Sequence, residues 1–174
     1  IVTDYGHGML GPEEVEILCE KSRFLAVNTQ VNAGNMGFNT VSKYRRSDFL
    51  CVSENELRLE ARSRRRDIRD IMIDVGSKLN CDKMIITRGQ DGCLCYSKDE
   101  GFSEIPAFGT SVIDRVGAGD AVFSVAALCV AQNAPMEIVG FIGNAVGAEA
   151  VATVGHRTST QKVQLIRHME SLLK

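Results

Sequence analysis

Short apolar segments alternate along the chain with longer stretches in which apolar residues recur at helical spacing, and no other feature limits the fold as strongly. Strands that alternate with helices are typical of a layered α/β domain, in which helices flank a largely parallel sheet. Tight glycine turns, "RGQDG" and "KDEG", join the last three apolar segments, so we expect the sheet to be antiparallel at one edge. The expected strands are residues 1–3, 24–28, 49–52, 83–87, 93–96 and 103–106.

Helices are expected between and after these strands. The first opens at Pro12, because proline suits a first helical turn and the acids Glu13 and Glu14 suit the positive end of the helix dipole. The arginine-rich run "RSRRRDIRD" lies within the next helical pattern, where we expect a solvated face and hold a phosphate or nucleic-acid patch as the weaker alternative. The later helices are expected at about residues 57–79, 119–130 and 136–153.

A final amphipathic pattern ends the sequence. Ser159 and Thr160 are suitable caps for a helix that begins after them. We expect the apolar residues of this helix to face the core. These residues are Val163, Ile166, Met169 and Leu173.

Length and composition favour one ordinary globular domain. The 174 residues are 44% hydrophobic, and 20 lysines and arginines stand against 22 acids, which gives no global reason to expect nucleic acid or a membrane as a partner. Six cysteines without Cys-x-x-Cys spacing indicate buried, reduced thiols of a cytoplasmic protein, and a metal site at Cys93 and Cys95 is the weaker interpretation. The start at "IVTDYG", without methionine and inside a strand, suggests a fragment.

Glycines follow the first strand in "GHGMLG", where Gly6, Gly8 and Gly11 have the spacing of a dinucleotide-binding fingerprint. In that fingerprint the third glycine lies within the helix, whereas here Pro12 suits the first helical position. The second strand also ends in Asn28, not in the acid that binds a ribose. A plain turn is therefore favoured, and a nicotinamide- or flavin-dependent oxidoreductase stays as an alternative.

A second glycine loop, "TRGQDG", follows a buried strand. Thr87 ends that strand, and Gly89 and Gly92 flank a polar turn. Glycine and Asp-Gly are common turn formers, so these residues by themselves favour an ordinary hairpin.

The third glycine loop, "VGAGD", stands directly before an apolar helix. The first N–H groups of a helix have no helical acceptors, and the small residues Gly117, Ala118 and Gly119 allow a phosphate to approach them closely. Asp120 could simply suit the positive end of the helix dipole. Glycine at a helix start, however, costs about 1 kcal/mol relative to alanine, so the glycines before Asp120 favour a functional role for this turn over a purely structural one. A carboxylate beside an anion cradle can take the proton of a hydroxyl during phosphoryl transfer.

Several motifs together resemble one family. "DRVGAGDAVFS" is similar to the C-terminal signature of the ribokinase (pfkB) family of ATP-dependent carbohydrate kinases. "IITRGQDG" resembles the strand and phosphate-side loop of that family, and "FIGNAVGAEAV" resembles the helix that borders the adenine. "TDYGHGML" and "VNTQVN" are most similar to the branch that phosphorylates heptose phosphates, the kinase half of ADP-heptose synthase. The resemblance covers nearly the whole chain and implies a ribokinase-like α/β fold.

The resemblance implies roles for individual residues. Asp120 matches the catalytic base, and the amides of residues 117–119 match the anion hole. The residues implied at the ATP phosphates and the adenine are Thr87, Gly89, Gly92 and Asn144. The resemblance also implies ATP and Mg²⁺ as cofactors and a small sugar as substrate, with a homodimer and a fused or separate nucleotidyltransferase domain as further expectations. The sugar-binding and lid part of such kinases lies upstream of the matched part, so we expect these 174 residues alone to be inactive.

Two stretches depart from the pattern of the family. The Asn-x-x-Glu of the family, which organises magnesium and phosphate, should fall in "SENELR", where Asn55 is followed three residues later by Arg58. Asn55 is therefore the candidate at the cofactor, and Glu56 is the candidate metal ligand. Val116 stands where a threonine often precedes the glycine turn. These departures support one rival function, a non-catalytic nucleotide-binding or regulatory domain with the same fold.

Overall fold

The computed structural model describes residues 1–109, 113–114, 116–152 and 159–174, and its centre is a six-stranded sheet whose strands follow the order of the sequence. The first four strands are parallel, whereas each of the last two runs antiparallel to the strand before it. The prediction of a largely parallel α/β sheet with an antiparallel edge is therefore confirmed. The strands are β1 (Val2–Asp4), β2 (Ala26–Thr29), β3 (Phe49–Ser53), β4 (Lys83–Thr87), β5 (Cys93–Ser97) and β6 (Gly101–Ile105).

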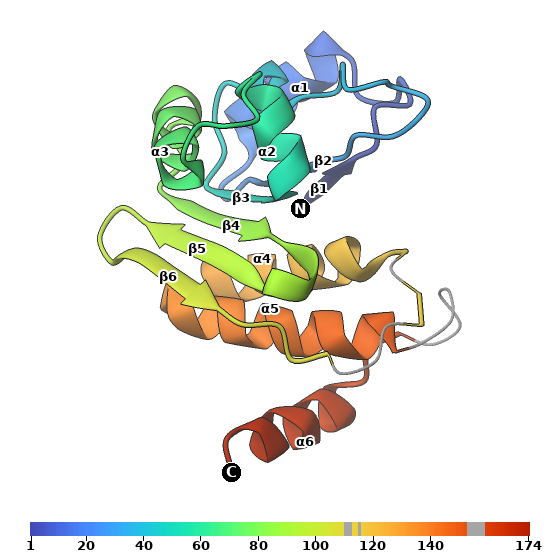
Figure 1. The fold of residues 1–174 in the computed structure, drawn as a ribbon. Coiled ribbons are helices and arrows are strands. Elements are labelled where there is room, and N and C mark those ends of the chain that lie inside the picture. Colours follow the sequence, from blue (N-terminus) through green and yellow to red (C-terminus); the bar gives the residue numbers. More distant parts are fainter. Residues whose placement is uncertain (110–112, 115, 153–158) are drawn as a thin grey trace.

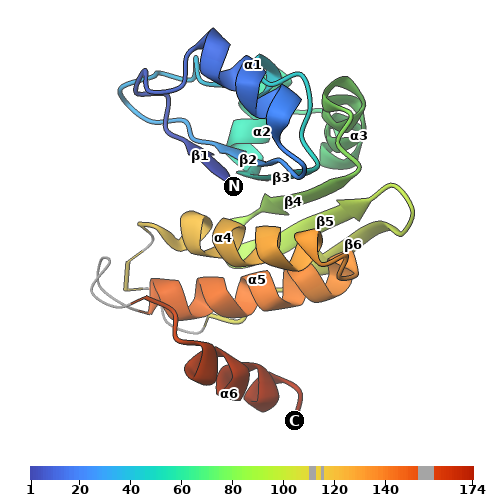
Figure 2. The ribbon, with the colours of Figure 1, turned by 180° about the vertical axis from the view of Figure 1, so that it is seen from behind.

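Helices cover both faces of the sheet and give the molecule a layered build (Figure 1). The helices are α1 (Pro12–Lys21), α2 (Glu54–Glu60), α3 (Ile68–Leu79), α4 (Ala118–Ala131), α5 (Met136–Val151) and α6 (Lys162–Leu172). The first three helices pack on one face, and α4 and α5 lie side by side on the other, as Figure 2 shows from behind. The last helix packs on α5, away from the sheet.

The strands are buried on both sides because successive residues of a strand point to opposite faces. In β3, Leu50 and Val52 belong to the core beneath the first three helices, whereas Phe49 and Cys51 belong to the core beneath α4 and α5. None of these four side chains is more than 2% exposed. Burial on both faces fixes the strands in place, and with them the strand ends that carry the candidate site.

The expectation of one helix over residues 57–79 is wrong, because α2 and α3 are separate helices there. The first of them ends before Arg62, which adopts a φ of +47°. Asp67 then opens α3, since its side chain accepts a hydrogen bond from the Arg69 N–H at 2.8 Å. The periodic apolar residues downstream of Asp67 all belong to α3, so local capping sets the boundary. The arginines between the two helices are exposed, as expected.

The expected inward face of the last helix is also wrong in most positions. Leu165 is buried and Met169 packs beside it against α5, whereas Val163, Ile166 and Leu173 are 61%, 40% and 75% exposed. The helix packs on α5 along a narrow stripe. Leu165 and Met169, four positions apart, lie on the same side of the helix and are sufficient for this contact. Gln161, not Ser159 or Thr160, occupies the cap position. The expected end of the preceding helix, Thr153, lies outside the described residues.

The cysteines are free thiols, five of them buried and Cys129 half-buried. Cys93 and Cys95 share a face of β5, with their Sγ atoms 3.8 Å apart. Within the described ranges, no three His, Cys, Asp or Glu side chains come together as a metal-binding group. No described helix has both the length and the apolar composition that crossing a bilayer requires.

Candidate functional site

Two adjoining cavities lie at the edge of the sheet where the carboxyl ends of the parallel strands meet. Ligands of open α/β sheets bind at this edge. The first cavity, of about 490 Å³, is bordered by the ends of β2, β3 and β4 and by the start of α2. The second cavity, of about 570 Å³, extends from β4 to the segment after β6 and to the C-terminal half of α5. Thr87, Gly89 and Gly119 line both, so the two cavities meet at these residues.

The glycine turn before α4 faces the place where the cavities meet. Gly117 caps the helix in the left-handed conformation, with a φ of +79°, and the Ala121 N–H donates to the Gly117 carbonyl at 3.0 Å. The N–H groups of residues 118–120 precede this bond, in the turn where helix geometry provides no acceptor. A Cβ on Gly119 would meet open space, because this residue faces the cavities. The expected start of a helix is confirmed, and its end can receive an anion.

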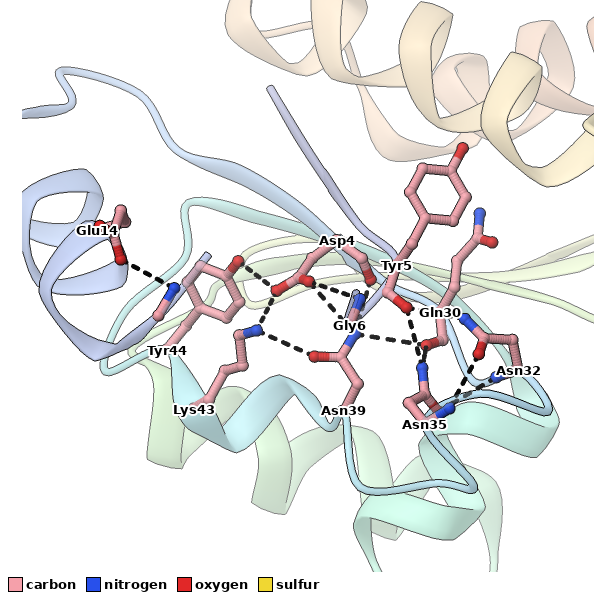
Figure 3. Close-up of polar contacts among 11 residues, drawn as sticks. Asp4, Tyr5, Gly6, Glu14, Gln30, Asn32, Asn35, Asn39, Lys43 and Tyr44 are labelled. Atoms are coloured by element: carbon pink, nitrogen blue, oxygen red, sulfur yellow. Dashed lines mark hydrogen bonds and ion pairs between the residues drawn. The ribbon is translucent and has the colours of Figure 1, made fainter. Parts of the chain in front are cut away.

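Asp120 lies in the first turn of α4, half-buried beside the first cavity. Its Oδ1 accepts a hydrogen bond of 2.8 Å from the Gln30 side-chain amide. The Tyr5 hydroxyl also faces the carboxylate: burial, followed by the charge and hydrogen bond of Asp120, raises the pKa of Tyr5. Figure 3 shows the Tyr5 and Gln30 side chains pointing toward α4. Sequence reasoning missed both residues, although each is the first residue after a parallel strand.

The loop after β4 combines a structural glycine with residues open to the cavities. Gly92 is buried at a φ of +79°, and a Cβ there would collide with the Ile105 carbonyl, so the fold itself requires glycine. Gly89, at a φ of +60°, would meet nothing within 4 Å. Thr87 and Gly89 line both cavities, whereas Gly92 lines only the second. The hairpin expected from the turn residues is present, and it also forms a wall of the site.

Asn144 projects from α5 toward the end of β6. Its side-chain amide donates to the carbonyls of Ile105 and Pro106, at 2.9 and 2.8 Å. These bonds fix the backbone after β6, which borders the second cavity together with Asn144 itself. Asn144 therefore shapes the wall of the second cavity and does not line the first, which Gln30 borders.

The start of α2 brings several oxygen ligands to the first cavity. Glu56 is held from both sides: its Oε2 accepts from the N–H and hydroxyl of Ser53, each at 2.8 Å, and its Oε1 accepts from the Val31 N–H at 3.0 Å. Asn55 lines the same cavity. Arg58 instead pairs with Glu54 at 2.8 Å. Arg58, which departs from the Asn-x-x-Glu pattern of the family, thus does not line the cavity. Ser53 and Glu56 do line it, and they have the same spacing as the asparagine and glutamate of that pattern.

Asn28 lies in the wall of the first cavity. The sequence had drawn attention to this residue only because it stands where a dinucleotide-binding fold has an acid. The residue is 5% exposed, and its side-chain amide donates to the Cys51 carbonyl at 2.7 Å. Its Oδ1 is buried without a hydrogen-bond partner. Buried polar atoms are normally satisfied, so this oxygen is suited to a donor supplied by a ligand or by a metal-bound water.

The loop "GHGMLG" is a turn that leads into α1. Gly6 and Gly8 have φ values of +68° and +86°. Gly11 is the N-cap and Pro12 the first residue of α1, so the interpretation of Pro12 as the helix start is confirmed. The third glycine therefore precedes the helix, in contrast to the dinucleotide fingerprint. Val116, the other departure from the expected pattern, is 68% exposed before the Gly117 turn.

Curated relatives match the chain along most of its length. The chain is 28% identical over 161 residues to the bifunctional protein HldE of Citrifermentans bemidjiense, which covers 91% of this chain and 32% of the relative. The HldE protein of Actinobacillus pleuropneumoniae serotype 5b is 27% identical over 176 residues, covering 98% of this chain and 36% of that protein. The chain thus spans about a third of the length of these relatives.

Solved structures share the fold. Phosphofructokinase-2 from Escherichia coli in complex with potassium superposes with a TM-score of 0.77 at 16% identity, over 95% of this chain and 54% of that one. Arabidopsis thaliana ribokinase complexed with ribose and ATP gives a TM-score of 0.75 at 13% identity, over 91% and 51%. The sequence model of the pfkB family carbohydrate kinases matches residues 13–163 of the chain. The chain belongs to the pfkB family of carbohydrate kinases.

Proposed function

We propose that the chain is the nucleotide-binding and catalytic part of an ATP-dependent carbohydrate kinase. The observation that carries this proposal is the placement of Asp120: it lies in the first turn of α4, directly after Gly119, which lines both cavities, and its carboxylate accepts a hydrogen bond from Gln30 in the wall of the first cavity. A kinase needs a proton acceptor for the attacking hydroxyl and donors for the charge of the transferred phosphoryl group. Both are provided within one helical turn.

The second cavity is the proposed site of the nucleotide. Asn144 and the backbone that it holds after β6 would border the adenine, as the resemblance of "FIGNAVGAEAV" implies. The triphosphate would run toward Thr87 and Gly89, which line both cavities, and end at the amides of residues 117–119. Close approach of phosphate to these amides is possible because Gly119 has no side chain.

The first cavity is suited to the terminal phosphate, a magnesium ion and the acceptor hydroxyl. Carboxylate, carbonyl and hydroxyl oxygens are the ligands that Mg²⁺ prefers, and it commonly keeps several waters and takes one or two carboxylates. Glu56, Asn55 and the unpartnered Oδ1 of Asn28 provide such oxygens. When bound, Mg²⁺ would neutralise phosphate charge. Asp120 would accept the proton from the acceptor hydroxyl, and the amides of residues 117–119 would hold the transferring group.

The acceptor is a sugar or sugar phosphate, with a heptose phosphate as the specific proposal because "TDYGHGML" and "VNTQVN" resemble the branch of the family that phosphorylates heptose phosphates. We extend to this chain the expectations that the complete protein forms a homodimer and works with a nucleotidyltransferase domain. We also propose that the sugar-binding and lid part lies outside these 174 residues, which cover about half of the solved chains that they match.

The complete protein tests this function by its ligands and its products. ADP release is measured with Mg-ATP and a heptose phosphate, ribose or fructose 6-phosphate, and calorimetry compares ATP with NAD. We expect acceptor-dependent ADP release and preferential binding of ATP. ATP binding without turnover of any acceptor would favour the regulatory domain, and preferential binding of NAD would favour an oxidoreductase.

A further inference from the structure

Two residues that lie outside the glycine turn hold Asp120 from the neighbouring sheet edge. Tyr5 and Gln30 are the first residues beyond β1 and β2, and the two strands pair so that Asp4 stands opposite Thr29. The Gln30 N–H donates to the Asp4 carbonyl at 2.9 Å, which continues the ladder one residue further. The two side chains therefore start side by side and both reach toward α4 (Figure 3).

The backbone of this pair is fixed by three asparagines of the next loop, Asn32, Asn35 and Asn39, which we call the asparagine clamp. The Asn35 side-chain amide donates to both the Tyr5 carbonyl, at 3.0 Å, and the Gln30 carbonyl, at 2.8 Å. Asn32 donates to the same Tyr5 carbonyl at 2.8 Å. Asn35 thus bridges the residues that follow the two strands and limits their movement relative to each other.

The clamp is itself anchored in a buried polar cluster. Asn39 is 5% exposed, and its amide donates to the Asp4 carbonyl at 2.7 Å while its Oδ1 accepts from the Lys43 ammonium at 3.0 Å. The Asp4 carboxylate accepts from the Tyr44 hydroxyl at 2.8 Å and also pairs with Lys43 (Figure 3). Such a connected set of buried hydrogen bonds is rigid, and its rigidity extends to the backbone of Gln30.

We propose that Gln30 is a positioning residue for Asp120, acting through its amide and held in place by the asparagine clamp. This inference rests on the proposed role of Asp120 as the base. The Gln30 amide donates to Oδ1 at 2.8 Å, while a carboxylate has about four acceptor sites, so capacity remains for the substrate hydroxyl. The amide is neutral, so it can fix the direction of the carboxylate without adding a charge beside it.

Among the described residues, two titratable groups interact with Asp120 and are uncharged at neutral pH: the Tyr5 hydroxyl after β1 and the buried Cys51 thiol in β3. Acidic Glu56 and basic Arg88 line the same first cavity. Burial, with smaller contributions from Cys93, Glu56 and Asp120, raises the pKa of Cys51. A change at Gln30 should therefore be visible in the acidic limb of the rate–pH profile, where the base loses its charge.

The test uses the complete protein and two variants of Gln30. Gln30→Glu keeps the shape but replaces the donor by a second carboxylate, and Gln30→Met keeps the length but removes the donor. We expect Gln30→Glu to move the acidic limb of kcat upward by about one pH unit or more. Both variants should lower kcat at neutral pH by about tenfold to a hundredfold, because the base is no longer held, while the KM for ATP changes less than about twofold.

The control is Gln164→Glu, which adds the same charge on the exposed face of α6 and should leave the profile unchanged. The acceptor in these assays is whichever of a heptose phosphate, ribose and fructose 6-phosphate gives the highest rate. If the enzyme phosphorylates none of them, ATP hydrolysis, with water as the acceptor, is measured instead. Wild-type kcat and pH profile in both Gln30 variants, beside an inactive Asp120→Asn protein, would overturn the positioning role alone. Normal turnover by Asp120→Asn would instead overturn the proposed function. Melting temperatures show which variants are folded.

Discussion

Gly119 and Gly92 lack a side chain for different physical reasons, although the sequence presents both as loop glycines. Gly119 faces open space in the cavities, whereas a Cβ on Gly92 would collide with the Ile105 carbonyl at a left-handed φ. A methyl group at Gly119 should therefore interfere with a bound phosphate and leave the fold intact. The same group at Gly92 should interfere with the fold.

Gly119→Ala is expected to keep or raise the free energy of unfolding, by up to about 1 kcal/mol, because alanine is favoured over glycine in a helix. Its affinity for Mg-ATP should fall at least about tenfold, since the methyl group occupies space beside the anion cradle. Gly92→Ala should lower the free energy of unfolding by more than about 1 kcal/mol. Thermal unfolding and calorimetry measure the two quantities. Equal losses of stability in the two variants would contradict the cradle.

The residues of the site differ in how far the sequence reveals them. Asp120 could be found from its neighbours in the sequence. Glycine is unfavourable at the start of a helix, so the Gly-Ala-Gly before this acid indicates a function. Gln30 and Tyr5 carry no such local signal, since each is an ordinary residue beyond a short strand. Their meeting with Asp120 depends on strand order and register, which bring Gln30 to a residue 90 positions further along the chain.

At the scale of elements, capping decides where helices begin when periodicity does not. Asp67 opens α3 through a hydrogen bond from the Arg69 N–H and separates it from α2. The arginine-rich connection contains no glycine or proline to mark a break, which is why residues 57–79 suggested one helix. The prediction for the inward face of the last helix was wrong for a related reason. Apolar residues recur around this helix, but only Leu165 and Met169 pack against α5.

Asp67→Ala removes the cap of α3 and should lower the free energy of unfolding by about 1 kcal/mol. Asp67→Ser keeps an oxygen at the cap and should retain most of that stability. Neither change should alter ATP affinity, because Asp67 is exposed and lines neither cavity. Chemical denaturation gives the stabilities, and an Asp67→Ala protein as stable as the wild type would show that the cap has no part in the boundary.

At the scale of the whole molecule, the order of strands and helices could be predicted because burial on both faces leaves near-continuous apolar runs in the sequence. Successive residues of these strands point to opposite faces, so both faces of the sheet are apolar; the first three helices cover one face, and α4 and α5 cover the other. The buried cluster around Asp4 could not be predicted, because Asn39, Lys43 and Tyr44 reach it from a long loop without periodicity.

The Asp4 cluster should make the stability of the molecule sensitive to acid. Burial alone would raise the pKa of Asp4, but the hydrogen bonds from Lys43, Tyr44 and Gly6 and the charge of Lys43 together lower it. A lowered native pKa gives stability that is present above the unfolded value of 3.8 and is lost as the pH falls through the native value. The stability difference between wild type and Asp4→Asn should therefore shrink between about pH 5 and pH 3. A constant difference, measured by denaturant unfolding, would contradict this account.

The most direct test of the account is Asp120→Asn in the complete protein, since this change preserves size and most hydrogen bonding but removes the proton acceptor. We expect ATP affinity and melting temperature to stay close to those of the wild type, while kcat falls by about two to four orders of magnitude, the usual contribution of a positioned general base. Near-normal turnover, or a joint loss of stability and ATP binding, would show that Asp120 only supports the start of α4.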